Sequence, residues 1–465
     1  MTDGERPVLS PWDGVSVIVG IVVGVSLFRA PGPIFASVDA PWEGMALWAL
    51  GGALSLVGAL CYAELAASDP RSGGDYRYLT RAFGPAVGFL FGWAQLVAIL
   101  TGSIGAMAYV FADYARVVWP GASGVGWAAA VVVGLTLPNL FGVELGRRVQ
   151  NTLTVIKIVG LLALVAAAFF APAPDAAAEP GPNLRGYGFA LILVLYAYGG
   201  WNDAAFVASE VRDPRRNVPR VLLLGTGAIV AVYLVVNAAY LSALGFAGLR
   251  ASQAPAAAVL AAATGTWGER VMSLLVMVSA LGAVQGLLFT GSRIYASVGR
   301  DHALFARLGR WHPRWGTPVG ALLAQTGVTL AWIAGVGTER GRAVIDGGLG
   351  AIGLPALPWE RFGAGFDTLV AGTAPVFWLF FLATGVALMV LRRREPDAPR
   401  PFRVPLYPLT PLVFCGSCLY MLHASLDYAG GLAVVGLLPL ALGLPLYFLS
   451  RRAGRTGGGG QDAIH

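Results

Sequence analysis

Long apolar stretches alternate with short polar connections along almost the whole chain. Stretches of roughly 18 to 25 apolar residues are long enough to cross a bilayer as helices. A spanning β-barrel would show short segments of alternating polarity instead, and that pattern is missing from the sequence. The pattern therefore predicts an all-α integral membrane protein with about twelve transmembrane helices, near residues 14–38, 43–67, 85–114, 124–142, 151–172, 186–209, 220–246, 268–298, 318–336, 366–391, 404–425 and 430–450.

The composition supports a membrane location. Of the 465 residues, 56% are hydrophobic and only 12% are charged, whereas soluble domains carry about 25% charged residues. The first apolar run is too long for a cleavable signal peptide and lacks a small-residue cleavage site, so we expect it to stay in the membrane. Cys61, Cys415 and Cys418 all fall inside expected spans, which argues against a disulfide framework or a zinc site.

The arginines predict the orientation. They collect in alternate connections, and the positive-inside rule places such connections in the cytoplasm. We therefore expect residues 1–13 and 451–465 to be cytoplasmic tails of a protein in the cytoplasmic (inner) membrane. The net charge of +7 then reflects topology, and no nucleic-acid partner is expected. The clearest examples are Arg212, Arg215, Arg216 and Arg220 after the sixth span, and Arg392, Arg393, Arg394, Arg400 and Arg403 after the tenth.

Two spans carry helix-breaking residues in corresponding positions. The first reads GIVVGVSLFRAPGPIFA over Gly20–Ala36, and the sixth reads LVLYAYGGWNDAAF over Leu193–Phe206. Unwound backbone is tolerated at membrane depth only where it is buried in protein or lines a cavity. Broken spans in matching places of two halves indicate the binding site of a secondary transporter. The alternative is that these glycines only allow close helix packing.

Six runs of sequence resemble L-type permeases of the amino acid, polyamine and organocation (APC) superfamily. They follow one another from the second span to the eleventh, so the resemblance covers most of the chain. The runs are Gly58–Trp93, FGVELGRRVQNTLTVIKIVGL, Tyr198–Gly225, SALGAVQGLLFTGSRIYASVGRDH, HPRWGTPVGALLAQ and REPDAPRPFRVPLYPLTPL.

The resemblance implies a LeuT-type fold with a 5+5 inverted repeat and broken helices one and six. Residues 14–172 would form the first repeat and residues 186–391 the second, with a long external loop at 338–366; residues 404–450 would add two peripheral helices. The function implied is sodium-independent transport of a free amino acid or related amine by alternating access, either proton-coupled or by exchange. No cofactor, metal or enzymatic activity is expected.

The resemblance also implies a substrate site at the two breaks. Amides of the first break would hold the substrate carboxylate, and carbonyls of Val22, Tyr196 and Gly199 would hold its ammonium group. Tyr196, Tyr198 and Trp201 would line or gate the side-chain pocket. The complete set of expected substrate-binding residues is Val22, Gly24, Val25, Ser26, Leu27, Tyr196, Tyr198, Gly199, Gly200, Trp201 and Asn202.

The first break departs from the family pattern. The usual GSGIF or GTGIF appears here as GVSLF over Gly24–Phe28, so the second glycine is lost and the hydroxyl is displaced to Ser26. A Cβ restricts the close backbone approach that glycine allows. Either the substrate differs from a common neutral amino acid, or the geometry of the break is shifted.

Lys157 is the only lysine in the chain and lies inside the apolar fifth span. A lysine can release its proton when buried, whereas an arginine stays charged; snorkelling to the interface is the structural alternative. In many permeases of this family a fifth-span lysine occupies the place of a bound sodium ion. The resemblance thus implies that Lys157 lies near Gly20 and a hydroxyl of the eighth span such as Ser279, and either titrates or only holds span one.

Other interpretations remain open. Arg29 and Asp203 follow the two breaks, and they either pair, select charged substrates, or serve the outer interface and the local backbone. A non-transporting amino-acid receptor on the same fold is the main alternative function. An enzyme is disfavoured because HExxH, GxSxG and Walker motifs are missing. The substrate's identity and the oligomeric state are not determined by the sequence.

Overall fold

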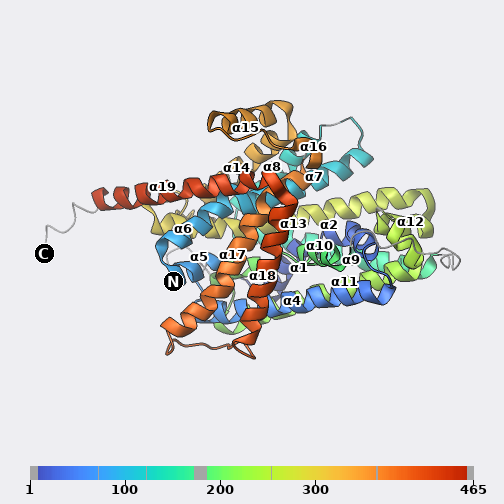
Figure 1. The fold of residues 1–465 in the computed structure, drawn as a ribbon, viewed down its shortest axis with the longest axis horizontal. Coiled ribbons are helices and arrows are strands. Elements are labelled where there is room, and N and C mark those ends of the chain that lie inside the picture. The colour runs from blue at the N-terminus through green and yellow to red at the C-terminus, as the bar shows by residue number, and fades with distance from the viewer. Residues whose placement is uncertain are drawn as a thin grey trace.

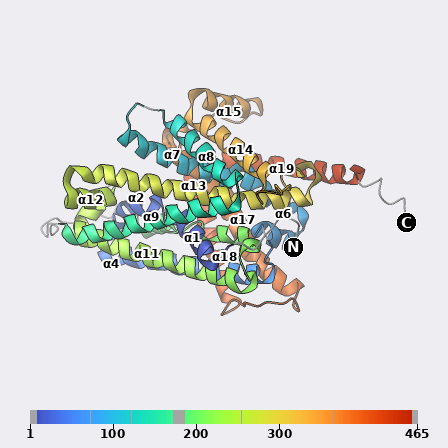
Figure 2. The same cartoon turned by 180° about the vertical axis from the view of Figure 1, so that it is seen from behind.

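The computed structural model describes residues 9–71, 73–121, 123–171, 186–252, 254–362 and 365–457, and this part of the chain is helical (Figures 1 and 2). An isolated bridge joins Leu9 to Val211. The α-helices are α1 Pro11–Val22, α2 Val25–Arg29, α3 Pro31–Phe35, α4 Pro41–Ser68, α5 Asp75–Phe83, α6 Pro85–Ala94, α7 Leu100–Val118, α8 Gly124–Leu140, α9 Val143–Phe170, α10 Gly186–Ala197, α11 Pro214–Ala251, α12 Pro255–Thr264, α13 Gly268–Asp301, α14 Val319–Gly337, α15 Glu339–Ala351, α16 Trp359–Phe362, α17 Phe366–Arg394, α18 Leu409–Ala429 and α19 Val434–Gly457. A π-helical segment, η1 Gln95–Ile99, joins α6 to α7, and 3₁₀ segments are η2 Trp201–Glu210, η3 Gly265–Trp267, η4 Ala303–Phe305 and η5 Gly430–Ala433.

Nine helical stretches among the described residues are long and apolar enough to cross a membrane. The number is lower than the expected twelve for three reasons. The first span is interrupted after α1, α8 has only 17 residues, and the apolar stretch Leu409–Arg451 contains both α18 and α19. The chain is therefore a multi-span helical membrane protein.

Helix α1 packs against α9, α11 and α13, and Figure 2 shows α9 lying between α13 and α11 with α1 beside it. Small residues make this close packing possible. A Cβ at Gly20 would overlap the side chain of Gln150 and lie 2.8 Å from Oγ1 of Thr154, both on α9. A Cβ at Gly286 of α13 would likewise overlap Ile21. The backbone of α1 thus approaches both neighbours within reach of their polar side chains.

The segment 338–366, expected to be an external loop, contains the helices α15 and α16. Thr338 caps α15 by accepting a hydrogen bond from the amide of Gly341, 2.9 Å away. The Asp346 carboxylate accepts hydrogen bonds from the Leu357 amide at 3.0 Å and from the Trp359 indole NH at 2.8 Å. The high glycine content favoured a loop, but the Thr338 cap, the Asp346 hydrogen bonds and apolar contacts stabilise helical structure here. Helix α15 stands apart at the top of Figure 1.

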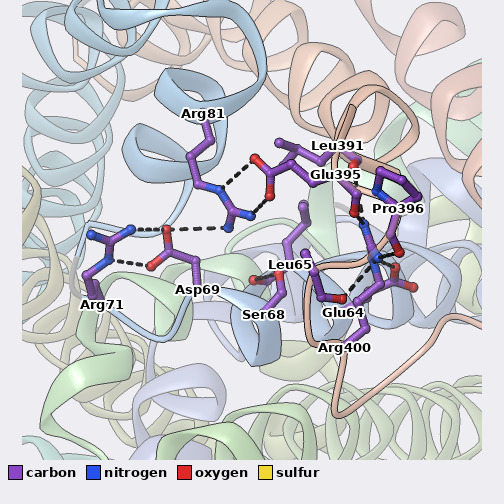
Figure 3. A network of polar contacts seen from close by, with 11 residues as sticks. Glu64, Leu65, Ser68, Asp69, Arg71, Arg81, Leu391, Glu395, Pro396 and Arg400 are labelled. Carbon is purple, nitrogen blue, oxygen red and sulfur yellow. Dashed lines mark hydrogen bonds and ion pairs between the residues drawn. The ribbon is translucent and has the colours of Figure 1, made fainter. Parts of the chain in front are cut away.

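At one end of the bundle, Glu64 near the end of α4 binds four groups from α17 and the segment after it. Its carboxylate accepts hydrogen bonds from Nε of Arg392, at 2.7 Å, and from Nη2 of the same side chain. It also accepts one from the backbone amide of Val404, at 2.6 Å. Arg400 forms an ion pair with it at 3.5 Å (Figure 3). The Glu64 side chain is 1% exposed, so these groups replace its lost hydration.

A second set of ion pairs continues from Glu64 toward α5. Asp69 receives two hydrogen bonds from Arg71, at 2.6 and 2.7 Å, and lies 3.6 Å from Arg81. Arg81 also pairs with Glu395 at the end of α17 (Figure 3). We call the residues Glu64, Asp69, Arg71, Arg81, Arg392, Glu395 and Arg400 the ion-pair network.

We predict that Glu64→Gln lowers the free energy of unfolding by roughly 3–5 kcal/mol, because a neutral side chain at this buried position leaves the partly buried guanidinium groups of Arg392 and Arg400 uncompensated. The control is Asp113→Asn, which breaks a half-exposed pair with Arg116 and is expected to cost about 0–1 kcal/mol. Thermal unfolding of the purified variants in detergent checks this. Equal shifts for the two variants would contradict the prediction.

Candidate functional site

The first span is interrupted between α1 and α2. Helix α1 ends at Val22, and Val23 is extended, with φ −70° and ψ 97°. Gly24, with φ −149° and ψ −153°, precedes the new helical start at Val25. Helices α2 and α3 continue one another through Ala30, which has helical dihedral angles. The interruption leaves carbonyls at the end of α1 and amides at the start of α2 without partners in their own helix.

The second interruption lies between α10 and η2. The chain turns at Tyr198–Gly200, and Gly200 has a φ of +105°, a left-handed conformation that favours glycine. A Cβ at Gly200 would also lie 2.8 Å from Cγ2 of Ile21 on α1. Gly200 therefore brings the second break into contact with the first.

One hydroxyl from α11 serves both breaks. The OH of Tyr233 lies 2.8 Å from the carbonyl oxygen of Val22 and 2.9 Å from that of Ala197. These are the last residues of α1 and α10. The Tyr233 side chain is fully buried, and its single hydroxyl proton is shared between these two carbonyls. Tyr233 was not singled out from the sequence, since an isolated tyrosine in an apolar helix carries no motif.

Lys157 binds the first break from α9. Its Nζ donates to the carbonyl oxygen of Gly20 at 2.7 Å, and the side chain is fully buried. Among the described residues no carboxylate forms an ion pair with it. Gly282 of α13 packs against the ammonium group of Lys157, since a Cβ at this position would lie only 3.3 Å from Nζ. The structure thus brings Lys157 and Gly20 together and excludes snorkelling to the interface.

Two further hydroxyls bind carbonyls near the first break. Ser279 of α13 donates to the carbonyl oxygen of Val23 at 3.2 Å, and Tyr240 of α11 donates to that of Leu27 at 3.3 Å. Ser279 and Lys157, expected near each other, bind two carbonyls of the first span: Val23, just after α1, and Gly20, in the last turn of α1.

A cavity of about 150 Å³ lies between the two breaks. Eight of the eleven expected substrate-binding residues line it, together with walls from α7, α13 and α17. The eight are Val22, Gly24, Val25, Ser26, Tyr196, Gly199, Gly200 and Asn202.

Leu27, Tyr198 and Trp201 do not line the cavity. Leu27 is fully buried. The OH of Tyr198 donates to the Trp48 carbonyl oxygen at 3.1 Å, and its ring packs against Trp48 and Tyr233. The prediction that Tyr198 and Trp201 line the pocket does not hold in this structure, because helical rotation next to a break turns neighbouring residues in different directions. A gating role for these two residues and a binding role for the Leu27 amide stay predictions.

Trp201 belongs to an aromatic cluster on the other side of the second break. Its ring centroid lies 5.1 Å from Tyr62, 5.4 Å from Phe381 and 6.4 Å from Phe414. Tyr62 donates in turn to Asp75, which also accepts from Thr384 at 2.6 Å. Burial raises the pKa of the Asp75 carboxyl to about 6. The cluster reaches the cavity wall, because Phe381 packs against the cavity-lining rings of Phe377 and Trp378.

The remaining walls of the cavity could not be identified from the sequence. They come from uninterrupted helices, whose lining residues depend on helix rotation. One of them has a local signal in the structure: Gln95 starts the π-helical segment η1, a type of distortion often found at functional sites. The side chains are Gln95, Ile99, Leu100, Ser103, Ala106, Met107, Ala283, Leu287, Val370, Thr373, Ala374, Phe377 and Trp378.

Arg29 and Asp203 are not paired with each other within the described residues. Arg29 is exposed at the end of α2 and interacts electrostatically with Asp367 of α17. Asp203 is 6% exposed and lines the cavity. The pairing considered from the sequence is therefore not formed in this structure.

The sequence profile described as amino acid permease matches residues 9–443. Among individual proteins, the large neutral amino acids transporter small subunit 2 of Mus musculus is 29% identical over 93% of this chain and 79% of its own length. The Asc-type amino acid transporter 1 of Mus musculus is 28% identical, with the same coverage of the two chains. The b(0,+)-type amino acid transporter 1 of Mus musculus is 27% identical over 89% of this chain and 81% of its own length.

We predict that Tyr233→Phe lowers the free energy of unfolding by about 1–3 kcal/mol, the cost of leaving buried carbonyls without a donor. Tyr420→Phe is the matched control, since its exposed OH donates to the Gly188 carbonyl oxygen at 3.0 Å, away from the breaks; a change within about 0.5 kcal/mol is expected. Thermal unfolding in detergent measures both. A control variant as unstable as Tyr233→Phe would refute the role of the shared hydroxyl.

Proposed function

The chain belongs to the amino acid permease family, and we propose that it carries a free amino acid across the cytoplasmic membrane by alternating access, independently of sodium. It is a transporter and not an enzyme. The observation that carries the proposal is the cavity between two helix breaks, lined by backbone of both. A zwitterion requires donors for its carboxylate and acceptors for its ammonium group in one dry space, and interrupted helices present both.

The substrate's main chain is proposed to bind the backbone of the breaks. Amides of Gly24, Val25 and Ser26 would hold the carboxylate, because the start of α2 lines the cavity and its first amides lack helical partners. Carbonyls of Tyr196 and Gly199 would receive the ammonium group. The carbonyl of Val22 already accepts from Tyr233 and would contribute its second lone pair.

The proposed architecture is the LeuT-type inverted repeat of twelve spans, with residues 14–172 and 186–391 as its halves and 404–450 as two added helices. Its support is that the interruptions fall in the first span of each half. With both termini cytoplasmic, the ion-pair network lies on the cytoplasmic side. The cavity wall on α17 ends at Trp378 and the network begins near Leu391, on the order of 20 Å apart along the helix. Opening this network would release substrate inward.

Lys157 is proposed to replace a bound sodium ion. Its ammonium group donates to an α1 carbonyl that the helix break leaves open, which is the task a cation would perform in a sodium-coupled relative. The same position allows either a fixed charge, as an exchanger needs, or a proton released in each cycle.

Counterflow in proteoliposomes tests the function. Vesicles loaded with one unlabelled amino acid should accumulate the labelled form, with and without sodium, and a panel of amino acids identifies the substrate. Dependence on an imposed pH gradient separates proton coupling from exchange. Saturable binding without accumulation for every amino acid would refute transport and indicate a receptor.

We predict that Lys157→Arg folds but reduces the initial counterflow rate at least about tenfold, because a guanidinium group is larger and stays charged. Gly282 leaves little room beside Nζ for the added atoms. Arg148→Lys, at an exposed position of the same helix, should keep wild-type uptake. Full uptake by Lys157→Arg would overturn the role given to this lysine.

A further inference from the structure

Asp203 is a buried carboxylate for which the described residues provide no cation. It follows the second break on η2, lines the cavity and is 6% exposed. Its hydrogen bond comes from the neutral Nδ2 of Asn202, 3.3 Å from Oδ1. A buried charge without a partner is costly, so this side chain requires a function that the main-chain binding described above does not supply.

Two more acceptors line the same cavity. Gln95 and Asn202 are 4% and 3% exposed, and both belong to the cavity wall. Oε1 of Gln95 and Oδ1 of Asn202 are buried and receive no hydrogen bond from the described residues. Buried side-chain oxygens are normally paired. Together with Asp203 they form a group of acceptors that lacks a donor, which we call the acceptor cluster.

The buried arginine and lysine side chains among the described residues, Arg293 and Lys157, are already engaged. Arg293 of α13 forms a buried pair with Glu210 at the end of η2, at 2.7 Å. Lys157 donates to Gly20. Asp75, the charged group that interacts electrostatically with Asp203, has the same sign. Tyr295 donates its OH to the backbone carbonyl of Gln95 at 3.0 Å. The described residues thus leave these acceptors open to a donor that enters the cavity.

We propose that the acceptor cluster is a side-chain subsite for a cationic amino acid, one whose side chain ends in an ammonium or guanidinium group. This inference rests on the proposed function and narrows its substrate class. The substrate cation pairs with Asp203, and its remaining N–H groups donate to Gln95 and Asn202, so that each unpartnered acceptor receives a hydrogen bond. A neutral substrate leaves the cluster unpaired.

Proteoliposomes containing the full chain test the subsite by competition. Uptake of the labelled amino acid identified by counterflow is measured in the presence of unlabelled competitors. Lysine, arginine and ornithine are the basic competitors, and alanine and leucine are the neutral ones. The wild type should prefer the basic probes. Asp203→Asn, which keeps the shape and removes the charge, should weaken basic competitors by at least about 30-fold, as expected when one partner of a buried charge pair is lost. Neutral competitors should change by less than about threefold.

Matched variants separate recognition from folding. Asp113→Asn removes a half-exposed carboxylate of α7 outside the cavity and should leave the basic preference unchanged. Asp203→Glu should retain part of that preference because it keeps the charge. If Asp203→Asn elutes as an aggregate, Gln95→Met provides the test, with an expected selective loss for basic probes.

The outcomes distinguish this inference from the proposed function. A wild type that transports only neutral amino acids refutes the cationic subsite and leaves transport intact. An equal loss for both classes in Asp203→Asn also refutes it, since Asp203 would then only position the break. If uptake by Asp203→Asn no longer responds to an imposed pH gradient but keeps the wild-type preference for basic competitors, Asp203 serves proton transfer and the subsite is refuted. Absence of any transport overturns the function itself.

Discussion

Unpaired backbone at the two helix breaks is the constraint on which the rest of the structure depends. Each break leaves backbone carbonyls without their helical hydrogen bonds inside the membrane, where every unsatisfied carbonyl costs several kcal/mol. The neighbouring helices supply the donors: Lys157 for Gly20, Ser279 for Val23, and Tyr233 for the ends of α1 and α10. The breaks are thereby held in one geometry, and the groups that face the cavity remain available.

The same constraint explains the glycines around the breaks. A donor reaches a backbone carbonyl only if the helices approach closely, and Gly20 and Gly282 provide that approach for α9 and α13. Gly200 adds a left-handed conformation and contact with Ile21. Small residues here serve both close packing and interruption, so the two interpretations considered from the sequence are compatible.

The sequence allowed prediction of those features whose chemistry is local. Glycines and polar residues inside apolar spans indicated both breaks, whereas the partnership of Lys157 with α1 was implied by the family resemblance. Trp201 was assigned to the wrong side of its helix because its direction depends on a 3₁₀ segment that no pattern revealed. The cavity walls on α7 and α17 and the hydroxyl of Tyr233 depend on helix rotation, which apolar composition does not encode. The helix α15 was not predicted because its glycine content is typical of a loop, although Thr338 provides an N-cap.

The central claim is that the backbone amides at the start of α2 bind the substrate's carboxylate. Hydrogen–deuterium exchange of the protein in nanodiscs, with and without a saturating transported amino acid, measures those amides directly. The account predicts slower exchange in the peptide covering residues 24–27, and no slowing when the amino acid is replaced by its decarboxylated amine. Unchanged exchange at residues 24–27 with a bound, transported amino acid would contradict it.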